Sequence, residues 1–180
     1  MNRRQALAVG LAGVTGLLLG AHTPYQQWVV YRKKHLLIGC HKTDPRTYDL
    51  AKQTIIVLES HLPAAKARVA RAPSAGRLAS LIGTGQMDVA VMDAAIAAGM
   101  SEGTGEFAPY GRTAIRLLTQ YDDRLLIART DFPDRYAWLL TATLTGSKLT
   151  AASNIASTQW IPWHPGSARF LNGLPEPNDD

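Results

Sequence analysis

Polar groups gather at two points where a predicted strand gives way to a predicted helix. One point is 40–48 and the other is 73–77. The first turn of a helix offers unpaired N–H groups and a positive dipole end, and hydroxyl or guanidinium groups beside it bind carboxylates or phosphates. The sequence therefore predicts a site for a small organic anion, such as a dicarboxylate or an acidic amino acid. The predicted site residues are Thr47, Tyr48, Ser74, Ala75, Gly76 and Arg77.

The residue types predict neither catalysis nor metal binding. Cys40 and His41 are adjacent, but neighbouring side chains on an extended segment point to opposite sides, and no second cysteine or spaced histidine pair completes a ligand set. The chain also has no nucleophile elbow and no phosphate-binding loop. We expect no enzymatic activity, no cofactor and no metal; a thiol reaction at Cys40 is the one enzymatic alternative. His164 is interpreted as part of a structural turn with Pro165 and Gly166.

The second polar group lies in the most regular stretch of the chain, 65–93. A strand is predicted at 67–70, and Pro73 ends it because proline cannot donate to a strand ladder. Ser74 is a natural N-cap for a helix that carries Leu78, Leu81 and Ile82 on one face, and a plainer interpretation is that it does nothing else. The apolar run 89–92 is typical of a strand that is buried on both faces. This β-α-β unit places the loop at 73–77 on the carboxyl edge of a parallel sheet, where open α/β sheets bind ligands.

The first polar group belongs to a similar unit. A strand is predicted at 35–39, followed by a loop at 40–46 and a helix that Thr47 caps and that continues to His61. Further predicted elements are a helix after Asp93 that reaches Met100, strands at 114–119 and 124–129, and a last helix at 168–171. Asp131, Phe132 and Pro133 start another helix, whose predicted apolar face carries Tyr136, Leu139, Leu140 and Leu144. The order predicts one α/β domain over residues 35–172, with a mostly parallel sheet covered by helices on both faces in three layers. The strands near His35, Lys66 and Asp88 are expected to be neighbours.

The N-terminal residues are typical of an export signal. Arg3 and Arg4 precede an apolar run at 6–21, in a partial match to a twin-arginine signal. Residues 1–21 are therefore a cleaved signal or a retained anchor, and residues 22–34 a juxtamembrane linker. If the anchor is retained, residues 6–30 hold the chain at the inner membrane. We expect a periplasmic location and a disordered tail at 173–180.

Length, charge and cysteine count limit the classes of protein and partner that remain. A chain of 180 residues, 46% of them hydrophobic, is long enough for one ordinary domain with a core. The net charge of +5 is dispersed except at 32–34, and no DNA-reading motif accompanies it, so no nucleic acid partner is expected. The single cysteine excludes an internal disulfide.

Three segments in this order resemble the periplasmic solute-binding proteins of the TAXI group, the receptors of tripartite ATP-independent transporters. They are 47–51 at the start of the first helix, 74–93 with Gly85, Asp88, Ala90 and Val91 matching, and the C-terminal 161–170 together with 131–136. The resemblance covers most of residues 35–172. It implies the two-lobed type II binding-protein fold, here reduced to one lobe.

The departures from that family affect the expected function. A second lobe follows the strand that resembles 125–129 in the family, and it is missing here. One lobe cannot close over a solute, so the resemblance implies weak binding of a small organic anion, or binding shared with a partner from a membrane transporter. The alternative is a structural or accessory subunit of an inner-membrane complex that binds no solute and uses the former ligand face for docking.

Overall fold

The computed structural model describes residues 31–147, 149 and 160–178. The chain divides into two compact units, residues 1–34 and residues 35–180. Residues 31–34, the described part of the first unit, are helical, and the predicted export signal lies outside the described residues. No helix in the described ranges is both long enough and apolar enough to cross a membrane.

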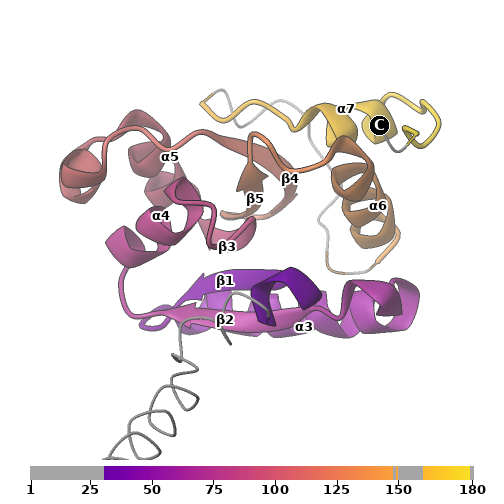
Figure 1. Ribbon diagram of the computed structural model, residues 1–180, viewed down its shortest axis with the longest axis horizontal. Coiled ribbons are helices and arrows are strands. Elements are labelled where there is room, and N and C mark those ends of the chain that lie inside the picture. The colour runs from indigo at the N-terminus through magenta and orange to yellow at the C-terminus, as the bar shows by residue number, and fades with distance from the viewer. Residues whose placement is uncertain (1–30, 148, 150–159, 179–180) are drawn as a thin grey trace, which may run out of the picture. The chain divides into compact units, whose positions relative to one another are not determined.

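The second unit alternates strands and helices over its first half and then adds a hairpin and two helices. The elements are β1 (Leu37–His41), α3 (Pro45–His61), the 3-10 helix η1 (Pro63–Ala65), β2 (Arg68–Ala72), α4 (Ala75–Gly83), β3 (Val89–Asp93), α5 (Ala94–Glu102), the 3-10 helix η2 (Gly105–Tyr110), β4 (Ile115–Tyr121), β5 (Arg124–Arg129), α6 (Asp134–Thr145) and α7 (Pro165–Leu171). They can be followed in Figure 1 from indigo to yellow.

The five strands form one sheet in the order β2-β1-β3-β5-β4. β1 pairs in parallel with β2 and β3, whereas β5 is antiparallel to both β3 and β4. Four of the five strands therefore run in the same direction. The predicted mostly parallel sheet is confirmed, and so is the expectation that the first three strands are neighbours.

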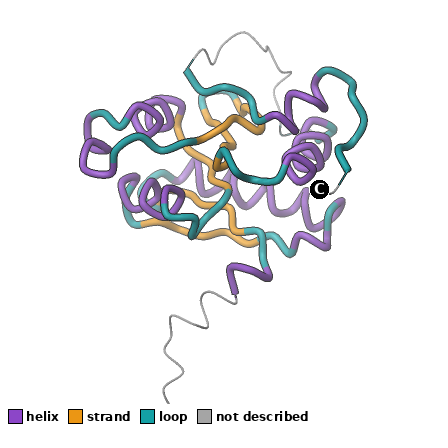
Figure 2. Tube along the Cα trace, turned by 45° about the horizontal axis from the view of Figure 1, so that its top comes forward, coloured by secondary structure: helices purple, strands orange, loops and turns teal. Residues whose placement is uncertain are grey.

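Helices cover both faces of this sheet, which gives the predicted three layers (Figures 1 and 2). On one face α4, α5 and η2 bury Leu78, Ile82, Met100 and Phe107 against inward-facing strand residues. On the other face α3 and α6 bury their own apolar side chains. Alternate residues of β3 join the two cores, because successive side chains of a strand point to opposite faces.

The helix predictions around β2 are confirmed, and two predictions around β1 are corrected. Ser74 caps α4 by accepting a hydrogen bond from the N–H of Arg77 at 3.1 Å. β1 begins and ends two residues later than predicted, so Cys40 lies in the strand and not in the loop. The cap of α3 is Asp44 and not Thr47, because the Asp44 carboxylate accepts from two backbone N–H groups and Pro45 suits the first helical position.

The C-terminal segment covers the outer edge of β4. Leu117 donates its N–H to the carbonyl of Pro162 at 2.9 Å and accepts from the N–H of His164 at 2.8 Å. α7 then packs on α6, where the buried hydroxyls of Thr141 and Ser167 lie 2.7 Å apart. α7 starts at Pro165, three residues earlier than predicted.

Two further predictions concern α6 and the tail. Tyr136 is 53% exposed, so its predicted place on the apolar face of α6 is wrong; Ala137, Leu140 and Leu144 form that face. The tail, predicted to be disordered, is described as far as residue 178. It contacts α6 through the ion pair between Arg135 and Glu176 at 2.5 Å.

Gly166 makes a close approach between α7 and the start of α6, and we expect Gly166→Ala to lower the free energy of unfolding by more than about 2 kcal/mol. A β-carbon on Gly166 would fall on the Asp134 carbonyl group, 2.7 Å from its carbon. The matched control is Gly83→Ala, whose new β-carbon would lie 3.9 Å from the nearest atom, on Thr113. Urea denaturation of both variants measures the difference, and equal effects would contradict this account.

Candidate functional site

The predicted site residues of α3 are engaged in local contacts. Thr47 is buried, and its N–H and hydroxyl both donate to Asp44, at 3.3 and 3.0 Å. The ring of Tyr48 has the guanidinium of Arg71 and the ammonium of Lys52 over it, each 4.6 Å from the centroid. These contacts fix the start of α3 and leave no hydroxyl of Thr47 free for a ligand.

The predicted residues at the start of α4 are only partly accessible. Ala75 and Gly76 are buried, and the Ser74 hydroxyl accepts from the N–H of Arg77. The ring of Tyr110 lies so close to Gly76 that a β-carbon there would come within 2.8 Å of it. The side chain of Arg77 is exposed and is the group of this set that a ligand could reach most directly.

The two predicted groups lie on adjacent strands, but their helices leave toward opposite faces of the sheet. The loops are joined by the hydrogen bond from Lys42 N–H to the carbonyl of Ala72, at 2.8 Å. α3 then packs in one helix layer and α4 in the other. The helices that follow β1 and β3, which are α3 and α5, also leave toward opposite faces. The point between β1 and β3 is therefore a topological switch point, where an open α/β sheet forms its ligand crevice.

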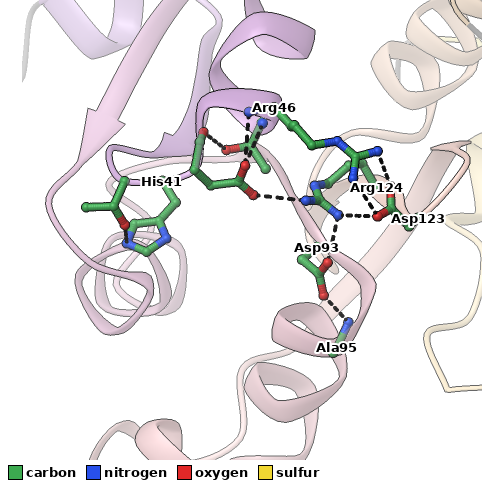
Figure 3. A network of polar contacts seen from close by, with 9 residues as sticks. His41, Arg46, Asp93, Ala95, Asp123 and Arg124 are labelled. Carbon is green, nitrogen blue, oxygen red and sulfur yellow. Dashed lines mark hydrogen bonds and ion pairs between the residues drawn. The ribbon is translucent and has the colours of Figure 1, made fainter.

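The switch point holds a network of ion pairs centred on Arg124 (Figure 3). Its guanidinium lies 3.3 Å from the carboxylate of Asp44, and 2.7 Å from each of those of Asp93 and Asp123. Asp44 ends the loop after β1, and Asp93 ends β3. Arg124 begins β5 and stands opposite Asp93 in the antiparallel ladder. One cation thus binds carboxylates from three places in the chain.

Two aspartates of this network, Asp44 and Asp93, also cap helices. Asp44 accepts from the N–H groups of Arg46 and Thr47 at the start of α3, and Asp93 accepts from the N–H of Ala95 at the start of α5, at 2.7 Å. Carboxylates of the chain itself thus occupy the two helix N-termini at the switch point. A free anion there would have to displace them and would meet their negative charge.

A second arginine extends the network to the surface. Arg46 binds Asp123 with both terminal nitrogens, at 3.2 and 3.1 Å, in the bidentate geometry that carboxylates favour. The side chain of Arg46 is 66% exposed, whereas that of Arg124 is 11% exposed. Both arginines bind Asp123, but one is exposed and the other is largely buried. Mutating each in turn therefore compares an exposed with a buried partner of the same carboxylate.

Cys40 has a structural environment. Its side chain is fully buried in the core between β1 and α3, and this burial raises the pKa of the thiol to about 11. The thiolate, which is the reactive form, is therefore scarce at neutral pH. His41 points to a local partner, with Nε2 3.2 Å from the Thr43 hydroxyl. Within residues 31–147, 149 and 160–178, no three His, Cys, Asp or Glu side chains are grouped so that they could hold a metal.

The sequence prediction does not include the ion network. Asp44 could have been found, because an aspartate followed by proline is a common helix start. Asp93 could also have been found, because it ends a predicted buried strand directly before a predicted helix. Arg124 carries no such signal, since its position depends on the antiparallel register between β3 and β5.

A scan against protein-family models finds no match for this chain, and a search of curated proteins finds none either.

We expect Arg124→Gln to lower the free energy of unfolding by about 1–3 kcal/mol, because it leaves half-buried carboxylates without their cation. Arg46→Gln removes an exposed partner of the same aspartate and should cost less than about 1 kcal/mol. Urea denaturation at low and high salt compares the two, and salt should weaken only the effect of the exposed pair. A larger loss for Arg46→Gln would show that the network is not centred on Arg124.

His164 should make stability depend on pH. Burial lowers the pKa of this imidazole and Arg116 lowers it further, against the opposing influence of the Asp134 carboxylate and the Phe132 carbonyl. The imidazole of His164 therefore binds a proton less readily in the folded chain than in the unfolded chain, where its pKa has the ordinary value of 6.5. Stability should fall as the pH drops through that value, because the unfolded state binds more protons there.

The variant His164→Asn tests this dependence. His164 Nδ1 accepts from the N–H of Gly166 at 3.3 Å, and asparagine can make the same cap without titrating. The free energy of unfolding of His164→Asn, followed between about pH 5 and 8, should change less steeply than that of the parent. A variant slope equal to the parent's would assign the pH dependence to other groups.

Proposed function

We propose that the chain is an exported accessory protein, similar to one lobe of a TAXI-type receptor, that binds a partner protein at the carboxyl edge of its sheet. The observation that carries this proposal is the Arg124 network at the switch point between β1 and β3. In a solute receptor this crevice is where helix N-termini and cations meet the ligand. Here Asp44 and Asp93 take the N–H groups, and Arg124 is neutralised by carboxylates of the same chain.

The connection between β5 and α6 supports the single-lobe interpretation. Only residues 130–133 separate Arg129 at the end of β5 from Asp134 at the start of α6. Phe132 in this connection is buried beside α6, and its ring lies 6.1 Å from that of His164. The place at which TAXI receptors carry their second lobe is thus a short, packed turn. A solute on the remaining lobe would stay open to water unless a partner covered it.

Weak solute binding at the start of α4 is the second candidate function. The exposed guanidinium of Arg77 favours an anion there. The basic side chains of Lys42 and Arg71 are also exposed, at the ends of β1 and β2. Three or four polar contacts worth about 0.5–1.5 kcal/mol each give an affinity near millimolar. Dicarboxylates and acidic amino acids are the solutes that this charge would select.

Site-specific photocrosslinking in cells tests the docking proposal. A photoreactive residue at Thr43, which is exposed beside the network, should give a discrete product with an inner-membrane protein. The same residue at Thr84 is the matched control, because Thr84 is also exposed but follows the C-terminal end of α4. Fractionation of these cells should find the chain outside the cytoplasm. Equal products from both positions, or a cytoplasmic chain, would end the proposal.

Titration of the purified protein separates the two candidates. Succinate, malate, aspartate and glutamate should each bind no more tightly than about 1 mM, with shifts confined to residues near Arg77. Arg77→Gln should abolish that weak response and leave the Thr43 crosslink in place. Sub-micromolar binding of any of these anions by the monomer would instead make the chain a solute receptor.

A further inference from the structure

The two edge strands of the sheet, β4 and β2, differ in whether another segment bonds to their outer side. At one edge, the outward N–H and carbonyl of Leu117 on β4 are bonded to the segment around Pro162 and His164. At the other edge, β2 pairs with β1 alone among the described elements. An open edge strand is a template for another extended chain.

The register of β1 and β2 identifies the outward groups. Arg68 donates its N–H to the carbonyl of Leu36 at 2.9 Å, and Lys42 donates to the carbonyl of Ala72 at 2.8 Å. In a parallel pair, alternate residues bond to the neighbour, so 68, 70 and 72 use their backbone groups toward β1. The N–H and carbonyl groups of Val69 and Arg71 therefore face outward. Within the described ranges, no backbone group bonds to them.

The side chains along this edge are basic. Arg68 and Arg71 are both exposed; Arg68 is paired with Glu59 at 2.9 Å, and Arg71 lies over the Tyr48 ring. Two copies of the edge would bring arginines together, and like charges on an edge are a known means of preventing self-pairing. The same charges attract a strand that carries carboxylates.

We propose that the outer edge of β2 binds an extended acidic segment of a partner protein by strand addition. Val69 and Arg71 supply backbone hydrogen bonds to the added strand, and the side chains of Arg68 and Arg71 select acidic residues in it. This proposal goes beyond the docking function above, because it names a different surface and the chemistry of what binds there. It holds whether or not the carboxyl edge also takes a partner.

The test uses the full-length, isotope-labelled chain and a synthetic peptide of alternating glutamate and valine. The peptide should slow hydrogen exchange of the Val69 and Arg71 amides and shift their resonances. The same peptide with lysine for glutamate should bind at least about fivefold more weakly, because the favourable cross-strand pair with Arg71 becomes a like-charge pair. Equal binding of the two peptides would overturn the proposal, as would shifts that cluster elsewhere. Protection of both amides before any peptide is added would also overturn it, because another part of the chain would then cover the edge.

Two variants separate backbone pairing from charge. Val69→Pro removes an outward N–H without touching the ladder to β1, so it should abolish peptide binding, whereas the control Val69→Thr keeps the N–H and the binding. Arg71→Glu should bind the glutamate peptide more weakly and the lysine peptide more tightly than the parent does. This reversal of preference tests the site even if Val69→Pro unfolds. If Arg71→Glu bound both peptides as the parent does, the Arg71 side chain would not select acidic residues. Val69→Pro leaves every side chain at the carboxyl edge in place, so the Thr43 crosslink should survive in this variant, and failure of strand addition leaves the carboxyl-edge proposal standing.

Discussion

The guanidinium of Arg124 joins parts of the domain that the sheet alone leaves apart. Asp44 begins α3 in one helix layer, and Asp93 begins α5 in the other, so the shared cation ties both layers to the carboxyl edge of β1 and β3. At 11% exposure, the side chain is shielded enough for these contacts to exceed an ordinary surface pair. Without the cation, three aspartates would repel one another at the carboxyl edge between β1 and β3. The network therefore stabilises this switch point.

The network affects which ligands the carboxyl edge can bind. A helix N-terminus attracts anions through its unpaired N–H groups, and at α3 and α5 aspartates of the chain already bind them. Exposed positive charge lies beside the network, on Lys42 after β1 and on Arg71 and Arg77 at the end of β2 and the start of α4. An exposed set of cations would suit the acidic surface of a protein better than a small solute, because each exposed contact is weak and a partner can make many of them.

The sequence predicts the framework well and the centre of the site poorly, for physical reasons. The stretch that contains β2, α4 and β3 is predicted correctly because each element carries its own local signal: Pro73, the Ser74 cap and the apolar run of β3. The start of α3 is missed because Thr47 and Asp44 are both good cap residues, although Pro45, which suits the first helical position, favours Asp44. Arg124 is missed for a different reason. Its role depends on which residue of β3 it faces, and antiparallel register between segments thirty residues apart has no local signal.

The two surfaces assigned to partners meet at Arg71. Its backbone belongs to the outer edge of β2, and its guanidinium lies over Tyr48 with Nη2 3.5 Å from the carbonyl of Lys42, at the carboxyl edge. A strand added beside β2 would run along Arg68 and Arg71, and its end would reach the exposed cations around Lys42. One acidic partner can thus contact both surfaces, and linked contacts strengthen one another because the second forms at a high effective concentration. Contacts that are weak one by one can in this way still hold a protein firmly.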